Sequence, residues 1–76
     1  MSVKPLNTIA PGDTVIIKDF NKDNICLIER LVEMGLIPGL KIRMIKKTPY
    51  KGPLEIKIRS FHLSLRWEDA GQILVV

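Results

Sequence analysis

The chain has 76 residues, of which 46% are hydrophobic and 26% are charged, a balance typical of a small folded domain and not of a disordered segment. No apolar run approaches the roughly 20 residues of a membrane helix, and one cysteine, Cys26, excludes an internal disulfide and a multi-cysteine zinc site. We therefore expect a single domain over residues 1–76, in a reducing, cytoplasmic compartment.

The net charge of +4 is unevenly distributed along the chain. Residues 1–40 have a net charge of −1 and the last ten residues −2, whereas residues 41–66 have a net charge of +7. A segment this basic is suited to contact nucleic acid, an acidic protein surface or anionic lipid headgroups. It is equally consistent with an ordinary solvated face of a sheet.

A turn followed by a strand is predicted near the start of the chain. Pro11 and Gly12 favour the turn, because proline presets the backbone of one turn position and glycine tolerates the next. The strand is expected over residues 14–20, which are rich in β-branched side chains. Because residues 15–17 are all apolar, we expect this part of the strand to be covered on both faces.

The helical spacing of apolar residues predicts one helix over residues 25–34. Asp23 or Asn24 can cap its first turn, and Gly35 stands where a helix commonly ends in a left-handed conformation. Such a short helix is marginal alone, so its apolar stripe must pack on a sheet. The stripe consists of Leu27, Ile28, Leu31 and Met34.

Beyond a second turn at Pro38 and Gly39, apolar and polar residues alternate in three segments typical of strands, at residues 40–44, 54–59 and 61–66. The last two are joined so tightly through Ser60 that this residue needs an unusual backbone conformation. Alternation assigns Phe61 to the core face. A helical turn over residues 67–70 and a closing strand over residues 72–76 complete the chain.

Five short strands and one helix predict a mainly β protein. Five strands hide both sheet edges only by curling on themselves, which favours a small, partly open SH3-like barrel. Its helix lies between the first and second main strands, and the helical turn precedes the last strand. An OB-type barrel is the alternative, because it has the same number of strands and one helix.

The sequence offers little catalytic chemistry, and we do not expect an enzyme. It contains no GxSxG elbow and no glycine-rich phosphate loop. Cys26 and His62 are weak candidates for a metal site; Cys26 is better interpreted as a small buried residue and His62 as a solvated one. A nucleic-acid-binding barrel remains an alternative, with Tyr50 and Trp67 as the plausible exposed aromatic residues.

The segment from Glu33 to Gly39, followed by Lys41 and Ile42, resembles the central signature of the FeoA family, the small cytoplasmic component of bacterial ferrous iron transport. The resemblance extends from residue 6 to residue 76. It includes Pro11-Gly12, Gly52-Pro53, Leu63-Ser64-Leu65-Arg66 and Glu68-Asp69-Ala70. The chain departs from the family at Ser60, where a glycine is common.

The resemblance implies an SH3-like accessory protein that acts on the membrane iron permease FeoB from the side of its cytoplasmic G-domain. It implies no cofactor beyond Fe(II) or another transition metal. The hypothesis is therefore a protein-interaction module, peripheral to the membrane only through the transporter and without nucleic acid as a partner. The alternatives are a nucleic-acid-binding barrel and a metal-sensing domain like those of metal-dependent repressors. The candidate partner-binding residues are Ile37, Lys41, Arg43, Lys57 and Arg59.

Overall fold

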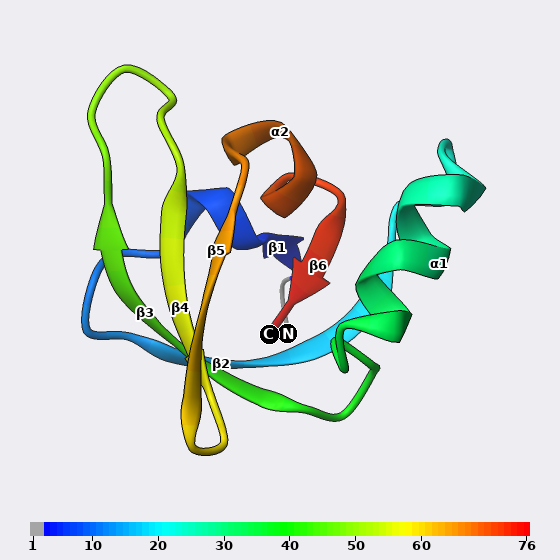
Figure 1. The fold of residues 1–76 in the computed structure, drawn as a ribbon, viewed down its shortest axis with the longest axis horizontal. Helices are drawn as coiled ribbons and strands as arrows, with labels where there is room; N and C mark the ends of the chain where they lie inside the picture. The colour runs from blue at the N-terminus through cyan, green and yellow to red at the C-terminus, as the bar shows by residue number, and fades with distance from the viewer. Residues whose placement is uncertain (1–2) are drawn as a thin grey trace.

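The computed structural model describes residues 3–76, so the first two residues of the expected domain lie outside the described part. Its strands form one antiparallel sheet in the order β1-β6-β2-β3-β4-β5, which curls around the core (Figure 1). The elements are β1 (Lys4–Pro5), the 3-10 helix η1 (Leu6–Thr8), β2 (Thr14–Phe20), α1 (Ile25–Glu33), β3 (Lys41–Lys47), β4 (Leu54–Ile58), β5 (Phe61–Leu65), α2 (Trp67–Ala70) and β6 (Ile73–Val75).

This architecture confirms a mainly β, partly open barrel, because β1 and β5 remain the two ends of the sheet. The helix between β2 and β3 and the helical turn before β6 are also as expected. The structure adds one short strand to the five predicted: β1 pairs with β6, with Lys4 opposite Val75 and Pro5 opposite Leu74.

The interior of the curl holds one hydrophobic cluster, to which every main strand contributes. Along β3 and β4, residues alternate between buried and exposed, so the expected period of two is confirmed. The expectation for β2 was wrong in part, because Ile16 is 42% exposed between the buried Val15 and Ile17. The outer face of β2 is therefore open to solvent at Ile16. The fully buried large side chains are Leu6, Ile17, Leu31, Leu36, Ile42, Met44, Leu54, Ile56, Ile58, Ile73 and Val75.

Helix α1 begins and ends as the sequence predicts. The Asn24 side-chain oxygen accepts a hydrogen bond from the Leu27 N–H at 3.1 Å, and Gly35 adopts φ +93° just after the helix. The Leu36 N–H then donates to the Leu31 carbonyl at 3.0 Å, which satisfies an orphan carbonyl of the last turn. Leu27 and Leu31 are buried as expected, but Met34, which caps the C-terminal end of the helix, is 37% exposed.

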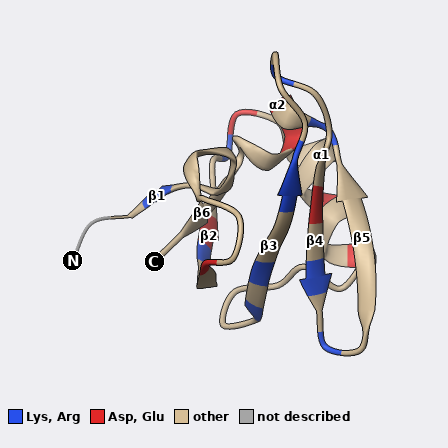
Figure 2. Ribbon diagram, turned by 90° about the vertical axis from the view of Figure 1, so that its left-hand side faces the viewer, with Lys and Arg blue, Asp and Glu red and all other residues tan. Residues whose placement is uncertain are grey.

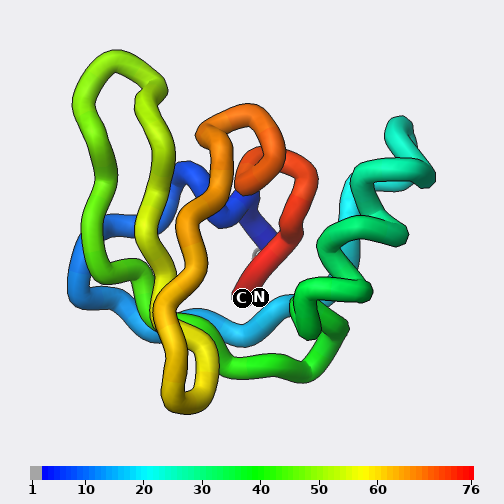
Figure 3. The backbone as a smooth tube through the Cα atoms, in the orientation of Figure 1, coloured from blue at the N-terminus to red at the C-terminus, as the bar shows by residue number. Residues whose placement is uncertain are grey.

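The chain then passes from α1 into β3 through a turn that hydrogen bonds hold against β2 (Figure 3). The Gly39 N–H donates to the Ile17 carbonyl at 2.7 Å, and the Ile17 N–H donates to the Leu40 carbonyl at 2.9 Å. Gly39 adopts φ +92°, where a residue with a Cβ is strained. This connection leaves Ile37 43% exposed beside the start of β3.

The β4–β5 hairpin departs from expectation at two positions. The left-handed residue is Arg59, with φ 51°, and not Ser60. The turn is made of these two residues alone, because Ile58 pairs with Phe61. Phe61 is 47% exposed, so its assignment to the core was wrong. It begins the edge strand of the sheet, where no further strand covers it.

Candidate partner-docking surface

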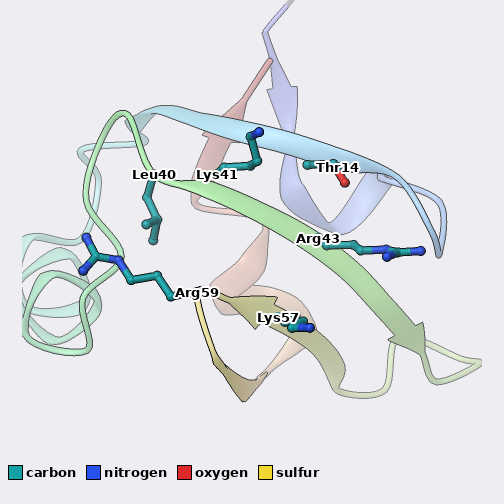
Figure 4. A pocket seen from close by; sticks show the side chains of 6 residues that line it. All are labelled: Thr14, Leu40, Lys41, Arg43, Lys57 and Arg59. Carbon is teal, nitrogen blue, oxygen red and sulfur yellow. The ribbon is translucent and has the colours of Figure 1, made fainter.

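Four of the five candidate partner-binding residues line one depression on the outer face of β3 and β4, here called the basic groove (Figure 4). Its volume is about 380 Å³. Strands β3 and β4 present these side chains because their alternate residues, Ile42, Met44, Ile56 and Ile58, fill the core. The basic groove is lined by Thr14, Leu40, Lys41, Arg43, Lys57 and Arg59.

The strand register places like charges opposite each other in the basic groove. Arg43 on β3 is paired with Lys57 on β4, an arrangement that destabilises a sheet. Their neighbours on the outer strands are uncharged or weakly basic, Thr14 opposite Arg43 and His62 opposite Lys57. The concentration of Lys and Arg on β3 and β4 is visible in Figure 2.

The one acidic residue of the basic segment lies outside this groove. Glu55 is paired with Lys46, on the other side of an irregularity in the β3–β4 pairing between Met44 and Lys46. The basic groove therefore has no carboxylate among its lining residues. Its positive charge is left for solvent, ions or a partner to neutralise.

An apolar cleft of about 180 Å³ adjoins the basic groove and shares Leu40 and Arg59 with it. Ile37 and Phe61 stand at this cleft with 43% and 47% of their surfaces exposed. A further hollow, along residues 37–41, again includes Arg59. The apolar cleft is lined by Gly35, Ile37, Leu40, Ile58, Arg59 and Phe61.

The structure thus brings all five candidate residues to one continuous surface. It also adds Leu40 and Phe61, which sequence reasoning had assigned to alternating core positions. Alternation could not separate Phe61 from Ile58, its buried partner across the turn. The exposure of Phe61 follows from its place on the edge strand of the sheet.

The domain that presents this surface matches a known family model over nearly its whole length. The FeoA domain model matches residues 4–76. The chain belongs to the FeoA family. Its relatives therefore include proteins of ferrous iron transport.

A curated relative of this FeoA protein is the Fe(2+) transport protein A/Fe(2+) transporter FeoB fusion protein of Porphyromonas gingivalis (strain ATCC BAA-308 / W83). The two are 36% identical over 47 residues, which are 62% of this chain and 6% of the fusion protein. This FeoA protein thus matches only a small part of its curated relative's length.

Solved structures confirm the SH3-like FeoA fold. A crystal structure of the iron uptake regulatory protein FeoA superposes with a TM-score of 0.83 at 29% identity, covering 99% of this chain and 96% of that one. A manganese-dependent transcriptional repressor in complex with manganese gives a TM-score of 0.92 at 18% identity, covering 100% of this chain and 37% of the repressor. The repressor shares the fold alone.

The weak metal candidates of this FeoA protein do not form a site. Cys26 is exposed on the first turn of α1, so its expected burial was wrong; His62 is exposed on β5, as expected. The first turn of α1 and the start of β5 lie at opposite ends of the view in Figure 1. Within residues 3–76 there is no group of three or more His, Cys, Asp or Glu side chains that could hold a metal ion. The residues present therefore do not fit the transition-metal binding that the family resemblance implies.

The other exposed aromatic candidates lie away from the basic groove. Tyr50 is fully exposed in the β3–β4 loop, at the end of the hairpins opposite to the β4–β5 turn (Figure 1). Trp67 is half-buried against the core, with the Lys51 Nζ 5.1 Å from its ring centroid, so its expected exposure was wrong in part. Neither residue lines the basic groove or the apolar cleft.

No helix in the described range 3–76 has the length and apolar character needed to cross a membrane.

Proposed function

We propose that residues 1–76 act as one non-catalytic docking module that regulates a FeoB-type ferrous iron transporter from its cytoplasmic side. The observation that carries this proposal is the joined basic groove and apolar cleft on one face of a FeoA-family fold. Such a surface offers charge and apolar area to a protein partner. In this function the protein needs no cofactor and binds no nucleic acid.

The fusion relative supports the choice of partner. Its printed name joins Fe(2+) transport protein A and the Fe(2+) transporter FeoB in one chain. Covalent linkage keeps two domains at a high local concentration, which favours contact between them. A module that is not linked to its transporter has to reach it through its own surface.

The size of the protein is compatible with docking through one face. It exposes 4982 Å² in total. A standard interface buries about 800 Å² per partner, which is about a sixth of that surface. The basic groove and the apolar cleft together form the centre of such an interface, and the surrounding strand residues its rim.

The proposal is tested by titrating the ¹⁵N-labelled protein with the soluble cytoplasmic G-domain of its cognate transporter. We expect chemical-shift changes concentrated in residues 36–46 and 54–66. Fe(II) and Zn(II) are added in separate titrations. Shifts around Cys26 and His62 with metal, and none with the G-domain, would contradict docking and favour metal sensing.

A further inference from the structure

We propose that the basic groove and the apolar cleft together bind an acidic peptide segment of the partner, with Arg59 at the junction between them. An apolar side chain of that segment enters the cleft, and neighbouring carboxylates contact the cations of the groove. This inference names the chemistry that the docking surface recognises, and it rests on the proposed function.

Arg59 stands where the depressions of this surface meet. Arg59 lines the basic groove, the apolar cleft and the hollow along residues 37–41, so it touches every depression on this surface. Its backbone adopts φ 51°, a conformation that glycine or asparagine adopts more easily. Backbone preference therefore does not explain an arginine at this position. An arginine here presents a planar fork suited to a carboxylate.

Like charges lie opposite each other in the basic groove. Arg43 and Lys57 face each other across β3 and β4, so the free surface carries a repulsion that the fold does not need. A carboxylate placed between these cations replaces the repulsion with two attractions. With Lys41 and Arg59, four cations line one depression without an acidic neighbour in its lining. The groove is therefore complementary to a segment with several Asp or Glu residues.

The apolar cleft favours a peptide as the occupant over a ligand that offers negative charge alone, because a peptide can also supply an apolar side chain. Its volume of about 180 Å³ is bordered by the half-exposed Ile37 and Phe61 and floored by the buried Ile58. An aliphatic or aromatic side chain there removes apolar surface of both partners from water. The segment therefore carries a Leu, Ile, Met or Phe close to its carboxylates.

The aromatic residues argue against a single-stranded nucleic acid. Proteins that bind single-stranded nucleic acid stack successive bases on several aromatic side chains along a charged groove. Here Phe61 is the single aromatic residue lining the groove or the cleft. Tyr50 is in the loop at the far end of the hairpins, as Figure 1 shows.

The main experiment measures binding of the transporter's cytoplasmic G-domain by calorimetry. The double variant Arg43→Glu/Lys57→Glu is compared with the control Lys18→Glu/Lys22→Glu, which changes the net charge equally. All four positions are exposed, and the control pair lines neither the groove nor the cleft. We expect the groove variant to bind on the order of 10- to 100-fold more weakly and the control within about threefold of the parent.

A second variant separates recognition from folding. Arg59→Gly relieves the left-handed backbone, so its thermal midpoint should equal or exceed that of the parent. Its affinity for the G-domain should nevertheless fall about tenfold, because the contact at the junction is lost. Phe61→Ala should weaken binding several-fold for loss of the apolar contact.

The probes for the segment itself are overlapping 15-residue peptides that cover the G-domain sequence. Peptides with three or more carboxylates beside an apolar residue should bind and should compete with the intact domain. Their affinity should fall as the salt concentration rises, because the cations lie at the surface.

Three results would overturn the inference. If the G-domain binds the parent and the groove variants equally, the recognition chemistry is wrong and the proposed function stands. If the G-domain does not bind the parent at all, both are wrong. If single-stranded RNA or phosphatidylserine vesicles bind the groove and no acidic peptide does, the occupant is a different polyanion.

Discussion

The connection from α1 to β3 and the two hairpin loops of β3–β4–β5 satisfy the same backbone requirement in opposite ways. Each needs residues with positive φ. The connection uses Gly35 and Gly39, whereas the hairpins use Tyr50, Lys51 and Arg59, at φ of 61°, 61° and 51°. The turns of the α1–β3 connection are therefore unstrained, whereas the hairpin loops retain strain of about 1–2 kcal/mol per left-handed residue.

The two regions differ in what the side chains at these positions contact. At Gly35 and Gly39 an added Cβ would meet no atom within 4 Å, so glycine serves the backbone and not the packing. In the hairpin loops, Lys51 lies over the Trp67 ring and Arg59 lines the docking surface. Glycine there would relax the turn but would remove these contacts. Tyr50 is fully exposed and has neither role.

The largest loss of stability is expected where the α1–β3 connection and the hairpins contribute side chains to the same hydrophobic core. Leu36 in the connection and Ile56 on β4 are each fully buried, and we expect either substitution by alanine to lower the free energy of unfolding by about 2–5 kcal/mol. Guanidinium denaturation followed by circular dichroism measures the loss. A loss below about 1 kcal/mol for Ile56→Ala, beside a full loss for Leu36→Ala, would contradict an equal contribution of the hairpins to the core.

Gly35→Ala should give the next largest effect, a loss of about 1–2 kcal/mol. The space around Gly35 is open, so the loss comes from the left-handed backbone and not from a clash. The same denaturation experiment applies, with Gly35→Asn as the control, because asparagine tolerates this conformation and should lose less. Equal losses for the two variants would contradict the backbone explanation.

Tyr50→Gly should stabilise the protein by about 0.5–1 kcal/mol, because it removes strain and no packing contact. The midpoint of thermal unfolding should therefore rise. A fall in that midpoint would show that Tyr50 contributes an interaction in spite of its full exposure.

Lys51→Gly should have the smallest effect, close to zero. The relief of strain is offset by losing the contact between the Lys51 ammonium and the Trp67 ring, worth about 0.5–1 kcal/mol. Lys51→Met keeps the strain and removes the charge, so it should destabilise by about 0.5 kcal/mol. Trp67 fluorescence during denaturation compares the two; a stabilisation by Lys51→Gly equal to that of Tyr50→Gly would exclude the ring contact.

Local sequence patterns predicted the features that depend on residues close together in the chain, namely helix ends and strand alternation. The Asn24 cap, the Gly35 ending and the alternation of β3 and β4 each depend on residues close in the chain. The short strand β1 carries no such signal. It exists because Lys4 and Pro5 meet residues about seventy positions away on β6, and a two-residue strand containing proline has no period to detect.

The candidate site also combines features that follow from the local sequence with features that depend on residues distant in the chain. Alternation alone placed Arg43 and Lys57 on the outer face, but the register that sets them opposite each other comes from the folded sheet. Alternation also assigned Phe61 to a face without showing that its strand is the edge. Cys26 precedes the buried Leu27 on α1, and one residue is a rotation of about 100° around a helix, enough to turn it to solvent.

The pairing of β1 with β6 has a consequence for any covalent fusion of this domain to another protein. Lys4 lies opposite Val75, so a linker at either end of the described chain leaves from the same end of the paired strands β1 and β6 (Figure 2). In the sheet order, β6 and β2 separate β1 from β3 and β4, which carry Lys41, Arg43 and Lys57 of the basic groove. A short flexible tether produces an effective concentration on the order of millimolar. A tethered copy therefore docks through an interface whose dissociation constant is on the order of millimolar. An untethered copy needs a dissociation constant near its own cellular concentration.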